Sequence, residues 1–415
     1  MNPQEAVAVS LRSEREIPES RGCGSVPELK VESEWGGVEL VEAVAEEWRQ
    51  LCLKGPCNQP FYRPEWIAAA IRAFAGEKRL LLITAWNGDR LRAVLPLLEH
   101  RGWAYGMPCV RLHTASRIPR FEFVHGNTDV AEAVSAVWQH LQNLPGWDVI
   151  ELINVPGGGA AERLEMAARE DAFPTSRYEY AQSPYILLKG NVVGGDFWRF
   201  GRSSRFRYQL RQKWRELGEF GALRLQRTDK ADPETLERFY RLERSGWKGR
   251  EGTAILSKPE LRQFYDGVAR CAEQFGYLSI YFLELGNTAV AAHLALTYGG
   301  AYYPIKVAYD ERFSKYGPGH LIIGSVLNEC VAHGLSEFDC LGEKNAALTK
   351  WTTAVHIYNS CSIFRNSVRG RMLRAAHGFL HGSKQALQTA ARSARSFSSR
   401  TKRWFSGPPQ SNPEK

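Results

Sequence analysis

The sequence predicts an α/β protein made of two related halves, and three features of the chain support that prediction. First, two pairs of apolar segments each flank a tight turn, around Gly88 in one half and Gly286 in the other, as in β-hairpins. Second, a segment of helical period and a short strand follow each hairpin, at residues 130–155 and 321–340. Third, the two sets lie about 190 to 200 residues apart, which is far too long for a solenoid repeat.

These features also divide the chain into four parts. We expect a disordered tail over residues 1–37, a first half over 38–188, a second half over 189–368 and a basic, flexible tail over 369–415. The first tail is polar and rich in Pro, Gly and Ser, which disfavours a packed core. In the last tail, the segment near Met372–Leu387 has the pattern of a basic amphipathic helix.

Composition narrows the class of protein. A hydrophobic content of 44% suits a packed globular chain, and no apolar run approaches the roughly 20 residues of a membrane helix. The eight cysteines form no CxxC pair and no secretory signal is visible, so we expect a cytoplasmic protein without a metal site. Residues 365–415 hold eleven Lys or Arg and one acid, so the net charge of +9 belongs to the tail.

The most informative segment is a strand at residues 301–310 that leads through a glycine-bearing loop into a helix. Gly317 and Gly319 flank a proline at the start of this helix, where unpaired backbone N–H groups can hold a phosphate or pyrophosphate. Lys315 and His320 lie beside them. We therefore predict a cofactor-binding loop; the alternative is a turn whose glycines only allow a positive φ.

Several polar residues near this loop are candidates for chemistry. Lys306 lies between apolar neighbours in the strand, so burial would require a partner such as Asp310 or Asp339, whereas a solvated lysine is the alternative. His293 lies in an apolar strand and is either a general base or a satisfied core histidine. Trp247 and Lys248 open a glycine-rich loop. Trp247 is either a core anchor or a substrate platform, and Lys248 is either solvated or faces an anionic acceptor.

The segment Arg199–Arg215 is basic and interleaved with aromatic residues, a pattern that can bind nucleic acid. The same residues also fit one amphipathic helix, because Phe206, Leu210, Trp214 and Leu217 recur at helical spacing. We favour the helix, with a solvated basic face that can make some contact with an anion.

At this point the sequence resembles a known family, the CelD/BcsL-type (FemAB-related) acetyltransferases of the GNAT superfamily. The resemblance covers residues 38–364 and rests on the segments RFRYQLRQKWRELGEFGALRLQR, RLERSGWK, YLSIYFLELGNTAVAAHLAL, YYPIKVAYDERFSKYGPGHLI and EFDCLGEKNAALTKW. It implies two tandem GNAT-like (acyl-CoA N-acyltransferase) domains, each a mixed, mostly antiparallel sheet flanked by helices. The first would be degenerate and the second would carry the chemistry.

The resemblance also implies an activity, a donor and site residues. The reaction would move an acyl group from acetyl-CoA or another acyl-CoA to an amine or hydroxyl, in exopolysaccharide, cellulose or cell-envelope synthesis, with no metal. The loop 317–320 would bind the cofactor, and the polar signature positions would be Trp247, Lys248, Lys306, Asp310, Asp339 and Lys350. The family commonly has a Tyr-Lys pair where this chain has Thr349-Lys350, so a tyrosine hydroxyl at that place is missing.

Three functions follow as hypotheses. The first is acyl transfer to a small-molecule or saccharide acceptor, with Asp310, Asp339 or His293 as general base and Lys306 and Lys350 positioning charge. The second is FemAB-like aminoacyl transfer from charged tRNA; otherwise we expect no nucleic-acid partner. The third is a non-catalytic module whose basic tail docks on a synthase complex or on the inner face of an anionic membrane.

Overall fold

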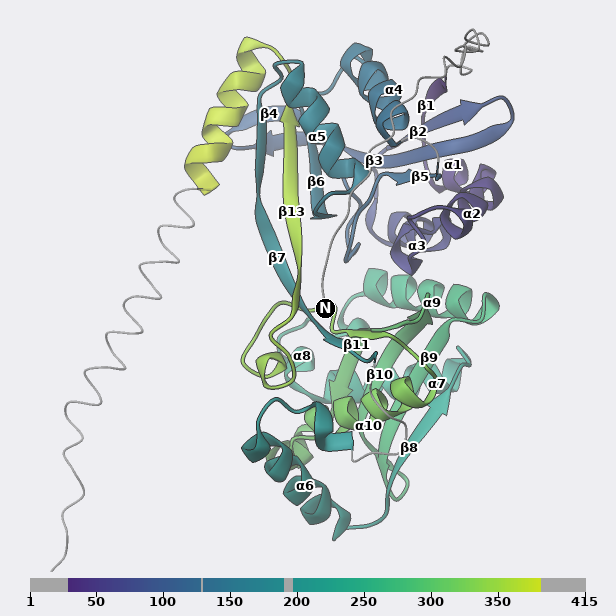
Figure 1. The fold of residues 1–415 in the computed structure, drawn as a ribbon, viewed down its shortest axis with the longest axis vertical. Helices are drawn as coiled ribbons and strands as arrows, with labels where there is room; N and C mark the ends of the chain where they lie inside the picture. The colour runs from purple at the N-terminus through teal and green to yellow at the C-terminus, as the bar shows by residue number, and fades with distance from the viewer. Residues whose placement is uncertain (1–28, 128–129, 190–196, 382–415) are drawn as a thin grey trace, which may run out of the picture.

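The computed structural model describes residues 29–127, 130–189 and 197–381, and two α/β halves follow one another along the chain (Figure 1). The first half comprises β1 Lys30–Gly36, α1 Val38–Ala43, α2 Ala45–Lys54, η1 Pro60–Tyr62, α3 Pro64–Phe74, β2 Leu80–Asn87, β3 Arg90–Ala104, β4 Met107–His113, β5 Val124–His125, α4 Val130–Asn143, β6 Val149–Pro156, α5 Ala160–Glu170 and β7 Thr175–Leu187. Both the hairpin around Gly88 and the helix at 130–143 are as predicted.

The second half repeats the same order of hairpin, third strand, helix and short strand. It comprises η2 Phe197–Phe200, α6 Ser204–Gly218, β8 Leu223–Thr228, α7 Pro233–Ser245, α8 Trp247–Arg250, η3 Ile255–Ser257, α9 Pro259–Gln274, β9 Leu278–Leu285, β10 Thr288–Tyr298, β11 Ala301–Tyr309, η4 Glu311–Tyr316, α10 Pro318–Ala332, β12 Glu337–Asp339, η5 Leu348–Lys350 and β13 Val355–Phe364. The predicted fold class, two tandem halves with mixed, mostly antiparallel strands and flanking helices, is confirmed.

The strands of both halves join into one continuous sheet. Its order is β1-β2-β3-β4-β6-β13-β7-β12-β11-β10-β9-β8, with β5 beside β3. The last strand, β13, returns to the first half and pairs antiparallel with both β6 and β7. The long strands β7 and β13 thus connect the upper and lower parts of the molecule (Figure 1). A strand from the predicted second half therefore completes the sheet of the first.

A shared hydrophobic core holds the two halves together. The edge of the Phe61 ring packs on Tyr303 with centroids 5.2 Å apart, and Trp66 of α3 packs on Phe264 of α9 at 5.3 Å. Such aromatic contacts add stabilisation beyond the area that they bury. The facing helices α3 and α9 are visible at the middle of Figure 1.

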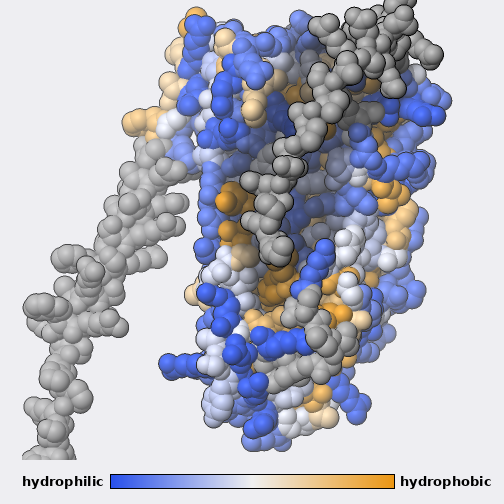
Figure 2. Space-filling view, viewed as in Figure 1, coloured by the Kyte–Doolittle hydropathy of each residue, from blue (hydrophilic) through white to orange (hydrophobic). Residues whose placement is uncertain are grey.

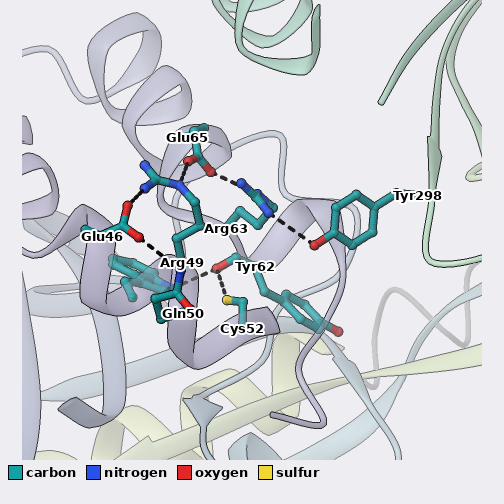
Figure 3. Close-up of polar contacts among 9 residues, drawn as sticks. Glu46, Arg49, Gln50, Cys52, Tyr62, Arg63, Glu65 and Tyr298 are labelled. Carbon is teal, nitrogen blue, oxygen red and sulfur yellow. Dashed lines mark hydrogen bonds and ion pairs between the residues drawn. The ribbon is translucent and has the colours of Figure 1, made fainter. Parts of the chain in front are cut away.

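A buried arginine crosses the same interface (Figure 3). Arg63 of the first half donates to the Tyr298 hydroxyl at 3.2 Å and lies over the rings of Phe275 and Tyr277. Its charge is balanced by Glu65, which also pairs with Arg49. Because the guanidinium is both paired and stacked, its burial is compensated, and the halves are fixed relative to one another.

Both predicted tails include residues that form regular structure. Of the tail predicted over 1–37, residues 30–36 form β1, which pairs with β2, and Trp35 lies under the Arg79 guanidinium, while residues 1–28 lie outside the described part of the chain. At the other end, residues 368–381 form a helix that packs on the first half through the buried Leu373. The amphipathic pattern predicted near 372–387 is helical as far as residue 381, and the remainder of it and of the predicted tail lies outside the described residues. Of the helices described, none has both the length and the apolar character needed to cross a membrane.

Candidate active site

The site is built where two neighbouring strands of the second half separate. β11 and β12 run parallel but pair only through Ala301 with Glu337 and Tyr302 with Phe338. Beyond this point β11 carries an extra residue opposite β10, at Pro304 and Ile305, and the strand bends there as β-bulges do. The gap between the strands opens into a cavity of about 440 Å³ that is lined by β11, β12 and the start of α10.

Helix α10 points its N-terminus at this cavity. Gly317 has φ 63° and ψ 50°, a left-handed conformation that favours glycine, and it turns the chain from η4 into the helix. Gly317, Gly319 and His320 all line the cavity. Three of the four predicted cofactor-binding residues therefore lie at the N-terminus of one helix. Lys315 is exposed, with its ammonium over the Tyr316 ring.

Two further ammonium groups lie at the cavity mouth. A Cβ at Gly317 would lie only 3.3 Å from the Lys213 Nζ, so this side chain of α6 lies directly over the loop. Burial and the charges of Lys350 and Lys213 lower the pKa of His320 to about 4. The ring is neutral at pH 7, and its Nδ1 accepts a hydrogen bond from the Trp351 indole at 3.0 Å. A helix N-terminus with two nearby cations favours an anionic ligand.

His293 lines the floor of the same cavity. The side chain is buried among apolar groups, and desolvation lowers its pKa to about 3. Its Nδ1 lies 3.3 Å from the Tyr302 hydroxyl. A group with so low a pKa is a poor proton acceptor, so the geometry favours the core-histidine interpretation of His293 over a general base.

The opposite face of β11 carries a buried ionic cluster. Glu243 of α7 is buried and accepts from Lys306 Nζ at 2.9 Å and from Lys248 Nζ at 3.3 Å. Lys248 also donates to the Val307 carbonyl at 2.6 Å, on the open edge of β11. Desolvation lowers the pKa of Lys248, while Glu243 opposes that shift. Lys248 and Lys306 are thus brought together, through a glutamate that the sequence interpretation missed.

Asp339 lies at the end of β12, immediately beyond the point of separation, and is fully buried. Its carboxylate pairs with Arg120 from the first half, accepts from Ser183 at 3.2 Å and accepts from the Leu341 N–H at 2.9 Å. His356 of β13 lies 3.6 Å from Asp339 and 3.0 Å from Glu337.

Glu337, Asp339 and His356 together place potential ligand atoms within 4.8 Å of one another. Because the Arg120 guanidinium already pairs with the buried Asp339 carboxylate, we interpret these residues as an Asp339–Arg120 ion pair, with His356 hydrogen-bonded to Glu337, rather than as a metal centre.

Asp310 and Trp247 both contact the η4 segment, whereas Lys350 belongs to η5. Asp310 caps η4 and pairs with Arg312 at 2.6 Å, and these hydrogen bonds lower its pKa. Trp247 is 43% exposed at the start of α8, where its N–H donates to Glu311. Lys350 lies with its ammonium 5.6 Å from the Phe206 ring. Lys350 lies near the predicted cofactor loop, because the Phe206 ring beside its ammonium also packs edge-on with His320, with centroids 5.3 Å apart.

The α6 segment is the predicted amphipathic helix. Phe206, Leu210 and Leu217 are buried, Trp214 is half-buried, and Ser203 caps the helix by accepting from the Phe206 N–H. Lys213 is a candidate site residue that the sequence interpretation missed on this helix, because spacing alone did not show which of its cations would lie over the loop. His356 was also missed, since a single histidine in a strand carries no local signal.

Comparison with known proteins finds an acetyltransferase domain model that matches the second half of the chain, and solved structures with a similar fold. Residues 204–347 match the family model described as acetyltransferase (GNAT) domain, which spans α6 to the segment before η5. The crystal structure of FemX is similar over 80% of this chain and 98% of that chain, with a TM-score of 0.54 and 11% identity. At this identity the similarity shows the fold alone.

Two other solved structures are more distant in shape. L-PGS from Bacillus licheniformis is 12% identical over 82% of this chain and 96% of that chain, with a TM-score of 0.46. A tandem GNAT protein from the clavulanic acid biosynthesis pathway is 12% identical over 80% of this chain and 98% of that chain, with a TM-score of 0.40. No curated protein matches the sequence.

Proposed function

We propose that this chain, whose residues 204–347 match the acetyltransferase (GNAT) domain model, transfers an acyl group from an acyl-CoA thioester to an amine or hydroxyl. The observation that carries the proposal is the separation of β11 from β12 into a cavity at the N-terminus of α10. The apolar lining suits the arm of such a donor, and Lys213 and Lys350 suit its phosphates. Acetyl-CoA is the donor that we propose first.

The open edge of β11 would hold the thioester. The Asp310 N–H bonds to Val290 of β10, so alternation along the strand turns Val307 and Tyr309 toward the open side. A backbone N–H from this edge, aimed at the thioester oxygen, would stabilise the tetrahedral intermediate by about 3 kcal/mol. The acceptor would approach from the opposite face, where Lys248 and Lys306 lie.

The acceptor must also lose a proton, and the structure favours a base other than the three predicted. Arginines engage Asp310 and Asp339, and His293 is buried in apolar surroundings. His356 has a partly exposed side chain with two carboxylates beside it, and we propose it as the general base. We expect His356→Gln to lower turnover by about 10²- to 10⁴-fold with donor affinity unchanged. Full turnover of this variant would overturn the assignment.

Donor binding tests the proposed function directly. A Cβ at Gly319 would lie 3.8 Å from the Tyr309 ring, so alanine fits there, whereas glutamate would place bulk and negative charge in the cavity. We expect calorimetry to show micromolar binding of acetyl-CoA to the full chain and to Gly319→Ala, and none to Gly319→Glu. The matched pair separates loss of the site from loss of helix α10.

A second pair of variants tests the phosphate contacts in the same titration. We expect Lys213→Ala to weaken acetyl-CoA and free coenzyme A alike, by about 10-fold, because one cation over the loop is lost. Lys315→Ala should leave both affinities unchanged. Equal effects of the two lysines would point to a diffuse surface charge rather than a built site.

The acceptor class is part of the proposal. We propose a small molecule or saccharide of exopolysaccharide or cell-envelope synthesis. The alternative donor is a charged tRNA, and the specific observation in its favour is the basic outer face of α6, where Arg205, Tyr208 and Arg215 are exposed. Absence of acetyl-CoA binding by the folded chain, together with a tRNA gel shift that salt abolishes, would favour this alternative.

A further inference from the structure

The helix over residues 368–381 is fixed on the first half by one of its faces. Leu373 is fully buried against Cys109, Val149 and Phe364. The His377 ring packs edge-on against Tyr105, with centroids 5.0 Å apart. These contacts determine which side of the helix faces the protein.

The opposite side of this helix is also apolar, and it is exposed. Val368 is 74% exposed, Met372 55% and Phe379 76%. Spacings of four and seven residues place them on one stripe, with Leu380, 44% exposed, at its margin. Orange and pale-orange side chains mark the upper left of the molecule in Figure 2, where Figure 1 places this helix. A helix that buries one face normally presents polar residues on the other.

Basic groups surround this exposed stripe, which we call the outer face. Arg371 is exposed beside it, and Arg369 is 53% exposed while paired with Asp148. The sequence that follows the helix, residues 382–415, holds seven Lys or Arg and one acid. The neighbouring β3–β4 hairpin, whose Tyr105 packs on the helix, carries Trp103 with 74% exposure. Apolar and aromatic side chains set among cations are typical of segments that lie in a lipid headgroup region.

We propose that the outer face, Val368, Met372, Phe379 and Leu380, binds the surface of an anionic lipid membrane. The helix would lie in the plane of the headgroups with its apolar side chains inserted, and the exposed Arg371 would meet lipid phosphates. A second copy of the chain is a poorer partner. A stable dimer buries about 800 Å² of surface on each subunit, which is more than the four side chains of one convex helix can supply. The like charges of two copies would also repel each other.

Vesicle binding of the full chain tests this proposal. We expect it to sediment with vesicles containing phosphatidylglycerol and to remain in solution with pure phosphatidylcholine. Met372→Glu places a carboxylate on the outer face and should lower the partition coefficient at least 10-fold. Met166→Glu, at an exposed methionine of α5, is the matched control and should leave binding unchanged. Acetyl-CoA affinity reports whether each variant is folded, independently of lipid.

Three outcomes would overturn the proposal. Equal vesicle binding by Met372→Glu and the wild type would show that the outer face takes no part. Binding that is lost on truncation after residue 381, and is unaffected by Met372→Glu, would assign the interaction to the tail alone. A dimer in solution that Met372→Glu converts to a monomer, without vesicle binding, would identify a second copy as the partner.

Discussion

Replacing Arg120 by Met is expected to lower the free energy of unfolding by about 3–5 kcal/mol, because it leaves a buried carboxylate without its counter-ion. Asp339 is fully buried, and Arg120 is its charged partner across the two halves. The Arg120 side chain also donates to Gln59 at 2.9 Å and lies over the rings of Tyr303 and Tyr358. Urea denaturation, followed by tryptophan fluorescence, measures the change.

The same substitution should also disturb the lining of the cavity. Phe338 and Cys340 flank Asp339 in the chain and both line the cavity, so displacement of Asp339 should weaken donor binding as well. The double variant Arg120→Met with Asp339→Asn is expected to cost less than the sum of the two single variants, because it removes both charges. Strict additivity would contradict a direct ion pair.

Glu122→Gln is expected to stabilise the protein at pH 8 by up to about 3 kcal/mol and to have little effect at pH 5. Burial raises the pKa of Glu122 to about 7, although its carboxylate accepts from the Ala161 and Phe123 N–H groups. The carboxylate lies so close to Gly159 that a Cβ there would overlap it. The site is a polar pocket beside the N-terminus of α5.

The direction in which the unfolding free energy changes with pH follows from proton linkage. A carboxyl whose pKa is higher in the folded state contributes stability below pH 4.5, and this contribution is lost as the pH rises through about 7. Glutamine has no proton to lose, so the variant should show a flatter dependence of unfolding free energy on pH between 4.5 and 7. The exposed Glu77→Gln is the control and should keep the wild-type slope. Parallel slopes for the wild type and Glu122→Gln would contradict the prediction.

Local features of this fold were predictable from sequence because short-range physics determines them. The turns at Gly88 and Gly286 and the apolar periods beside them specify two hairpins. The glycines at 317 and 319 specify a helix start free of bulky side chains, and that start does line the cavity. The fold class and the glycine-bearing start of α10 thus followed from residues close together in the chain, whereas cofactor binding by that loop stays a prediction.

The buried ionic contacts and the order of the strands could not be predicted, because they depend on contacts between residues that are distant in the sequence. Glu243 lies in a helix rich in charges, and only the fold shows that it is buried between Lys248 and Lys306. Arg120 comes from the loop after β4, and its pairing with Asp339 has no counterpart in local sequence. The position of β13 between β6 and β7 could not be predicted from the sequence either, because pairing between strands so far apart in the chain produces no periodic pattern of residues.

The position of β13 has a consequence for biosynthesis. When the ribosome has made β6 and β7, the first half still lacks the strand that lies between them, and residues 188–364 must be translated before that strand is complete. Until then the facing edges of β6 and β7 carry unpaired backbone groups, which are templates for wrong pairing. The first half therefore cannot finish folding ahead of the second, and a nascent chain that stops before residue 355 exposes these edges to chaperones and proteases.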